Sequence, residues 1–189
     1  LLLTGALLFA GCGQTGNTTG NTSSTTAGQE TTTTEQTDST AQTASDSTAS
    51  TNDIFTNMDT TDIDGNKMDS SIFAKNKVTL VNVCNVGCTP CVNEIPHLDK
   101  INSEYKDKGA AVYGLYGDLG MGISDDEMAQ IKDIMSNANA SYTQLRMDGT
   151  LATNESLLNI MAYPTTYVVG SDGTILDTIE GSKDYEGWK

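Results

Sequence analysis

Two cysteines, Cys88 and Cys91, stand three positions apart where the sequence changes from a strand pattern to a helix pattern. Residues 78–84 form an apolar run typical of a buried strand. Apolar side chains then recur at helical spacing, at Val92, Ile95, Leu98, Ile101 and Tyr105. Two thiols one turn apart at a helix N-terminus suit dithiol–disulfide exchange, because the local positive potential favours a thiolate. We expect Cys88 to be the nucleophile and Cys91, one turn inside the helix, the resolving thiol.

Two other uses of these cysteines can be weighed. A purely structural disulfide is disfavoured, because a loop this short gains little stability from closure. A zinc site is the second alternative, with Cys84, Cys88, Cys91 and His97 as its four ligands. Its spacing does not match common finger patterns, and a strand-to-helix path points Cys84 away from the other three. We therefore expect no metal and no bound organic cofactor.

The surroundings of this pair resemble the thioredoxin superfamily, and within it the TlpA/ResA-like extracytoplasmic thiol–disulfide oxidoreductases. The resemblance covers about residues 53–189. It implies an α/β, thioredoxin-like fold: a central mixed β-sheet flanked by helices, with an N-terminal hairpin and a central αβ insertion. The matching residues are Val81-Asn82-Val83, Cys88-Thr89-Pro90-Cys91, Glu94-Ile95-Pro96, Tyr163-Pro164-Thr165-Thr166-Tyr167-Val168-Val169 and Asp172-Gly173.

The resemblance also implies roles for single residues. Pro164 corresponds to a cis-proline that lies against the dithiol, and Tyr163 before it lines the substrate groove. Thr89 and Pro90 occupy the family's variable pair, which tunes the reduction potential and borders the same groove. Glu94 corresponds to a carboxylate that would raise the pKa of Cys91 and relay its proton. A solvated surface acid is the alternative for Glu94.

At two positions this sequence departs from related ones, which often carry Trp. The first is Cys84, which lies on the predicted core strand. We expect it to be a small buried hydrophobe rather than a third redox thiol. The second is Gly87, which removes an aromatic wall beside Cys88 and can open the site to bulkier partners.

The first 51 residues are typical of a secretion signal followed by a linker, and not of a folded domain. Residues 1–12 read as the end of a signal peptide, too short to span a bilayer. Leu8-Phe9-Ala10-Gly11-Cys12 resembles a bacterial lipobox, which implies a lipid on Cys12; an ordinary secretory signal is the alternative. Residues 13–51 hold 21 Ser or Thr and no large apolar side chain. We expect a disordered linker that reaches roughly 35 Å.

The domain is expected over residues 52–189. The patterns predict a hairpin of residues 54–56 and 67–69, a helical turn at 70–75 and a strand at 110–116. A helix capped at Ser124, a strand at 143–147 and a helix at 154–161 follow. A hairpin of residues 165–169 and 174–179 precedes a last helix that opens at Gly181. The chain starts without Met and ends inside that helix, so we expect both termini to be incomplete.

The charge of the chain excludes one class of partner. The net charge is −15, and residues after 52 hold all 10 Lys and Arg with 21 of the 25 acids, a balance of −11. Nucleic acid is therefore an unsuitable partner. We expect a monomeric protein disulfide reductase, lipid-anchored outside the bacterial cell membrane, which acts on disulfide-bearing proteins and takes electrons from a membrane dithiol protein. The alternatives are a peroxiredoxin-type peroxide reductase and a non-catalytic surface or metal-handling lipoprotein.

Overall fold

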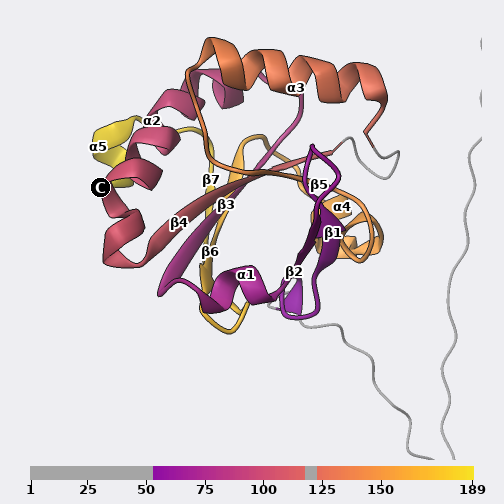
Figure 1. Cartoon of the computed structure of the whole chain (residues 1–189), viewed down its shortest axis with the longest axis vertical. Coiled ribbons are helices and arrows are strands. Elements are labelled where there is room, and N and C mark those ends of the chain that lie inside the picture. Colours follow the sequence, from indigo (N-terminus) through magenta and orange to yellow (C-terminus); the bar gives the residue numbers. More distant parts are fainter. Residues whose placement is uncertain (1–52, 118–122) are drawn as a thin grey trace, which may run out of the picture. The chain divides into compact units, whose positions relative to one another are not determined.

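The computed structural model describes residues 53–117 and 123–189, and a five-stranded sheet forms their centre (Figure 1). The strand order is β5-β4-β3-β6-β7. β3 and β4 run parallel, as do β4 and β5, whereas β6 is antiparallel to both β3 and β7. The mixed sheet confirms the predicted fold class. Its strands are β3 Val78–Cys84, β4 Ala110–Tyr116, β5 Gln144–Arg146, β6 Thr165–Gly170 and β7 Ile175–Glu180.

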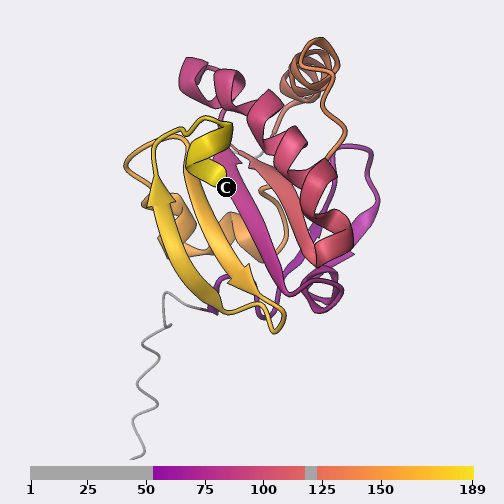
Figure 2. The ribbon, with the colours of Figure 1, turned by 90° about the vertical axis from the view of Figure 1, so that its left-hand side faces the viewer.

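Helices cover both faces of this sheet (Figures 1 and 2). α2 and α3 lie over one face, and α5 packs against α2. α1 and α4 lie over the other face with the chain that precedes β1. α3 and β5 form the predicted insertion, since they follow β4 and add a strand to its edge. The helices are α1 Ser71–Ala74, α2 Thr89–Tyr105, α3 Asp125–Asn137, α4 Glu155–Leu158 and α5 Tyr185–Trp188, with 3-10 turns at η2 Lys106–Lys108 and η3 Leu151–Thr153.

Alternation along β3 divides the apolar interior into two cores. Val81 and Val83 face α1 and α4, in a core that includes Phe55 and Phe73. Cys84 points to the opposite face, in a core that the buried side chains of α2 and α3 complete. The two active-site cysteines belong to this second core. Cys91 is fully buried in this core, whereas Cys88 lies at its border, beside exposed residues of the loop and the first turn of α2.

The N-terminal hairpin is present, but its first strand is not where the sequence predicts it. β1 is Asp59–Thr61 and pairs with β2 Lys67–Asp69. Residues 54–56 form a turn, in which the Thr56 hydroxyl donates to the Asp53 carbonyl. The turn buries two consecutive side chains, Ile54 and Phe55, against the same core, which a strand with alternating faces cannot do.

Two helices differ from their predicted bounds. α4 ends at Leu158, three residues early, where Asn159 is the C-cap and its side chain donates to the Glu155 carbonyl. α5 begins at Tyr185, not at Gly181, because Gly181 has a φ of 80° and the side chain of Asp184 caps the helix by accepting from the Gly187 amide.

The predicted capping box of α3 is confirmed. The Ser124 side chain accepts from the Glu127 amide, and the Glu127 carboxylate accepts from the Ser124 amide. The predictions for residues 1–12 and 13–51, including the lipid on Cys12, lie outside the described residues. Within the described ranges, no helix combines the length and apolar character needed to cross a membrane.

Candidate active site

The centre of the site is a disulfide between Cys88 and Cys91, at the N-terminus of α2. β3 ends at Cys84, and a three-residue loop leads to Cys88, which is the N-cap of the helix. The Cys88 sulfur accepts a hydrogen bond from the Cys91 amide at 3.2 Å. Pro90 fits the first turn because its missing amide hydrogen would have no partner there. The Cys91 amide would also stabilise a Cys88 thiolate after reduction, together with the helix dipole.

The two sulfurs differ in accessibility. The Cys88 residue is 9% exposed, whereas Cys91 is fully buried. Exposed Gly87, Thr89 and Pro90 surround Cys88. An incoming thiolate or disulfide would therefore meet Cys88 before Cys91, as the division into nucleophile and resolving thiol requires.

Pro164 precedes β6, at the end of the sheet where β3 leads into the cysteine loop. The peptide bond between Tyr163 and Pro164 is cis, so the isomer that the resemblance implies is confirmed. The next residue, Thr165, is registered with Val83 near the end of β3. This register carries Pro164 to the carboxyl end of β3, beside the start of the loop. Tyr163 is half-buried and packs against both cores.

Glu94 is buried, contrary to the surface-acid alternative. It is 1% exposed and accepts three hydrogen bonds. The Lys183 amide donates to Oε1 at 2.7 Å, and the Trp188 indole donates to the same oxygen at 3.0 Å. The Asn82 side chain donates to Oε2 at 3.0 Å. Burial raises the pKa of Glu94, and these hydrogen bonds offset that effect only in part.

Asn82 links Glu94 to the neighbouring strands. Its amide nitrogen also donates to the Thr166 hydroxyl on β6 at 2.8 Å. Its carbonyl oxygen accepts from the Cys84 thiol at 2.7 Å. The sequence reasoning assigned no role to Asn82, Thr166 or Trp188. An asparagine in the middle of a buried strand was the available signal, because a buried amide needs partners.

Cys84 is a free, buried thiol. Burial raises its pKa well above the ordinary value, and the negative charge of Glu94 adds to the effect. The thiol therefore stays protonated and donates to Asn82. Its burial supports the packing role that the sequence suggests, with a polar contact that the sequence did not indicate.

No potential metal cluster occurs in the described ranges, since nowhere there do three His, Cys, Asp or Glu side chains gather as ligands. Arg146, the single arginine of the chain, lies on β5 and pairs with Asp148 at 3.7 Å. β4 lies between β5 and β3, and the register pairs Arg146 with Tyr116 and Tyr116 with Cys84. Arg146 therefore lies two strands away from Cys84, at the same carboxyl end of the strands.

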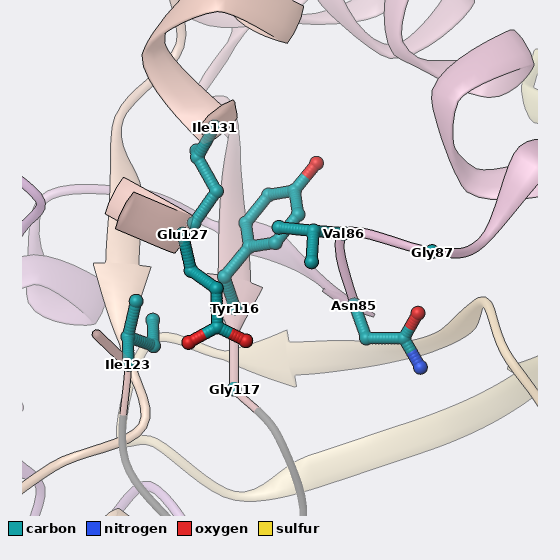
Figure 3. A pocket seen from close by; sticks show the side chains of 8 residues that line it. All are labelled: Asn85, Val86, Gly87, Tyr116, Gly117, Ile123, Glu127 and Ile131. Carbon is teal, nitrogen blue, oxygen red and sulfur yellow. The ribbon is translucent and has the colours of Figure 1, made fainter. Parts of the chain in front are cut away.

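A hollow of 230 Å³ opens beside the cysteine loop, and we call it the Gly87 hollow (Figure 3). A Cβ added at Gly87 would have one neighbour within 4 Å, the Asn85 side-chain oxygen at 3.7 Å, so this side of the hollow is open at position 87. Figure 3 shows the Tyr116 ring and the side chains of Val86 and Ile131 around it. Its lining comes from the loop, the end of β4 and the start of α3: Asn85, Val86, Gly87, Tyr116, Gly117, Ile123, Glu127 and Ile131.

Comparison with known proteins agrees with this geometry. The model of the Redoxin family matches residues 26–186. The thiol–disulfide oxidoreductase ResA of Bacillus thuringiensis is 23% identical over 131 residues, which cover 69% of each chain. The thioredoxin-like protein YneN of Bacillus subtilis is 28% identical over 109 residues, 58% of this chain and 59% of that one. A thioredoxin-family thiol:disulfide interchange protein from Chlorobium tepidum superposes with a TM-score of 0.57 at 21% identity, over 70% of this chain and 88% of that one.

Proposed function

Because the chain belongs to the Redoxin family and is a thiol–disulfide oxidoreductase, we propose that it reduces disulfides in other proteins outside the bacterial cell membrane. The observation that carries this proposal is the Cys88–Cys91 disulfide, with Cys88 at a helix N-terminus and Cys91 buried behind it. The order of accessibility matches the order of the two steps of dithiol exchange.

In the first step, the Cys88 thiolate attacks one sulfur of a substrate disulfide. The substrate disulfide breaks, a mixed disulfide forms, and one substrate thiolate leaves. Cys91 then loses its proton and attacks the Cys88 sulfur, which releases the second substrate thiolate and forms the Cys88–Cys91 disulfide. Two electrons pass to the substrate, so a dithiol protein must reduce the enzyme before the next cycle.

Glu94 acts in the second step. It lies three residues after Cys91 on α2, and residues at that spacing share one side of a helix. Burial raises the pKa of Glu94, which makes its carboxylate a stronger proton acceptor than an ordinary surface glutamate. We assign Glu94 to accept the proton of Cys91 during resolution.

The substrate groove lies around Thr89, Pro90, Tyr163 and Pro164. Thr89 and Pro90 are exposed beside Cys88, and Pro164 lies at the adjoining sheet edge. In this arrangement the Pro164 segment presents its backbone to an incoming peptide. Pro164→Ala should fold and lose most of its exchange activity; full activity in that variant would remove the assignment.

The Gly87 hollow supports entry of a bulky substrate side chain beside the attacked disulfide. A Cβ at position 87 meets no backbone atom within 4 Å, so a larger side chain can be introduced there to reduce the open space. Gly87→Trp should therefore slow the reduction of insulin more than that of a small aromatic disulfide such as Ellman's reagent. Equal effects on both substrates would contradict this use of the hollow.

The anchor is a lipid on Cys12, followed by the linker of residues 13–51. Its support is the lipobox-like sequence that ends at Cys12 and the polar composition that follows. Cys12→Ala should move the protein from the membrane fraction to the soluble fraction. A variant that stays with the membrane would place the anchor elsewhere. The electron donor is then a membrane dithiol protein on the same side.

The reductive direction rests on charge. No Lys or Arg lies between residues 78 and 99, and the residues after 52 carry a balance of −11. Strong oxidants of this kind depend on a heavily stabilised thiolate, with a pKa near roughly 3.5. Within residues 78–99 the helix N-terminus is the feature that favours a thiolate, and the buried Glu94 disfavours a second negative charge at Cys91.

Insulin reduction with dithiothreitol tests the activity directly. The wild type should accelerate insulin precipitation, and Cys88→Ser should abolish the effect. Cys91→Ser should accumulate mixed disulfides through Cys88. Hydrogen peroxide consumption without any insulin activity would favour the peroxide-reductase alternative, and neither activity would favour a binding lipoprotein.

A further inference from the structure

The chain after β7 folds back along α2, and three side-chain contacts hold it there (Figure 2). The Tyr185 hydroxyl donates to the Glu104 carboxylate. The Lys100 ammonium lies 3.5 Å from the centre of the Tyr185 ring. Nearer the active site, the Trp188 indole donates to Glu94. The two contacts of Tyr185 hold the segment against α2. The contact of Trp188 differs, because it is one of the hydrogen bonds of the buried Glu94 carboxylate.

The C-terminal segment supplies two of the three donors that Glu94 receives. The Lys183 amide and the Trp188 indole share Oε1, and Asn82 takes Oε2. None of these three nitrogens can accept a hydrogen bond from a protonated carboxyl. The network therefore fits the ionised form of Glu94, while burial favours the neutral form. Each donor that is removed shifts the balance towards the neutral form.

We propose that Trp188 is a positioning residue that holds the Glu94 carboxylate, and that the C-terminal segment thereby sets the pH above which Cys91 completes exchange. The inference rests on the proposed function, because it needs Glu94 to accept the proton of Cys91. It adds a residue 94 positions away in the sequence, on the short helix α5.

Several groups face Glu94 from the elements packed around it. His97, on the same helix, lowers the pKa of Glu94 through its positive charge. Cys84 on β3 and Tyr142 before β5 have raised pKa values and stay neutral near pH 7. The donors Asn82 and the Lys183 amide do not titrate, and neither does the Thr166 hydroxyl, which accepts from Asn82. The contacts around Glu94 therefore place Trp188, Asn82 and the Lys183 amide directly on its carboxylate.

The resolving step can be observed separately with Ellman's reagent. Attack by Cys88 releases the first thionitrobenzoate, and attack by Cys91 on the mixed disulfide releases the second. Stopped-flow absorbance gives the rate of the second release from pH 5 to 9. In the wild type this rate should rise through an acid limb that reports ionisation of Glu94.

Trp188→Phe removes the indole donor and keeps an aromatic ring. Loss of one hydrogen bond to a charged group corresponds to about one pH unit or more, so the acid limb should move to higher pH by that amount. Tyr185→Phe is the matched control, because it releases the same segment from Glu104 without touching Glu94. It should leave the acid limb in place. Equal shifts in the two variants would show that Trp188 only fastens the segment, and would overturn the proposal.

A second background separates this inference from the role of Glu94 itself. In Glu94→Gln, the Trp188→Phe change should produce no further shift. If Glu94→Gln removes the acid limb and Trp188→Phe leaves it unmoved, Glu94 keeps its role and Trp188 loses it. If Glu94→Gln leaves the acid limb intact, the assignment of Glu94 fails, and this inference fails with it.

Fluorescence gives a readout that needs no activity. Trp188 is the single tryptophan of the chain, so intrinsic emission reports on its indole alone. The emission of the oxidised protein should titrate with Glu94, and the titration should disappear in Glu94→Gln. If the emission follows the same pH curve in the wild type and in Glu94→Gln, the Trp188 indole does not respond to the ionisation of Glu94, and the proposed contact is contradicted.

Discussion

Replacing Glu94 with Gln should make the protein more stable relative to the wild type as the pH rises. Glu94 is 1% exposed, and burial raises its pKa more than its three hydrogen bonds lower it. The folded state therefore binds the Glu94 proton more tightly than the unfolded state. As a result, this residue lowers the free energy of unfolding as the pH rises from the ordinary glutamate pKa to the raised one. Above that interval the loss is complete, and below it the loss is absent.

The size of the effect follows from the same linkage. Each unit by which the folded-state pKa is raised corresponds to about 1.4 kcal/mol in the free energy of unfolding. Gln does not ionise, so the variant lacks this loss. Its amide nitrogen faces a donor, which adds a cost that does not change with pH. Carboxylates with lowered pKa values act in the opposite direction in both proteins and cancel in the difference: Asp62, Asp69, Glu104 and Asp172.

The measurement is urea unfolding of the oxidised full chain, wild type and Glu94→Gln, at intervals from pH 4 to pH 9. The difference in free energy of unfolding, variant minus wild type, should increase with pH and then level off. Glu127→Gln is a matched control, since its hydrogen bonds with Ser124 lower the pKa of Glu127. For that control the same difference should fall only at the acid end of the range, up to about the ordinary glutamate pKa, and stay level above it. A flat or falling difference for Glu94→Gln would refute the reasoning.

The remaining predictions concern the thiols and one tightly packed glycine. In the reduced protein at neutral pH, limiting iodoacetamide should label Cys88 at least about tenfold faster than Cys91, because the Cys91 amide donates to the Cys88 sulfur and a hydrogen bond to a charged group is worth about 1.5–3 kcal/mol. Peptide mass spectrometry that finds equal labelling would reverse the assignment. Gly117→Ala should destabilise the fold by about 1–3 kcal/mol, since the added Cβ would lie 2.4 Å from that of Met147. Gly87→Ala, where the nearest atom is 3.7 Å away, should stay within about 0.5 kcal/mol in the same denaturant titration.

Local patterns were sufficient for the elements that carry the cysteines. The apolar run of β3, the helical spacing of α2 and the capping box at Ser124 each involve neighbours a few residues apart, and all three were predicted correctly. Residues 54–56 were predicted wrongly because two adjacent apolar residues fit a strand pattern locally. Their burial on a single side depends on the sheet behind them.

The surroundings of Glu94 could not be predicted in the same way. Its spacing from Cys91 was visible, but its donors lie 12, 89 and 94 positions away in the sequence. Such contacts depend on how β3, α2 and the C-terminal segment pack together. Trp188 carried no local signal, because an aromatic residue near a chain end fits many structures. Likewise, the sequence suggested space at Gly87, whereas the walls of the hollow come from β4 and α3.

The reduction potential of the Cys88–Cys91 pair tests the central claim most directly. The full chain is equilibrated in glutathione and dithiothreitol buffers, and the oxidised fraction is determined from the mass shift after thiol alkylation. A protein disulfide reductase with a moderately stabilised thiolate should have a midpoint near thioredoxin's value of roughly −270 mV. A midpoint more positive than about −180 mV, the value of protein disulfide isomerase, would contradict the reductive function and indicate an oxidase or isomerase.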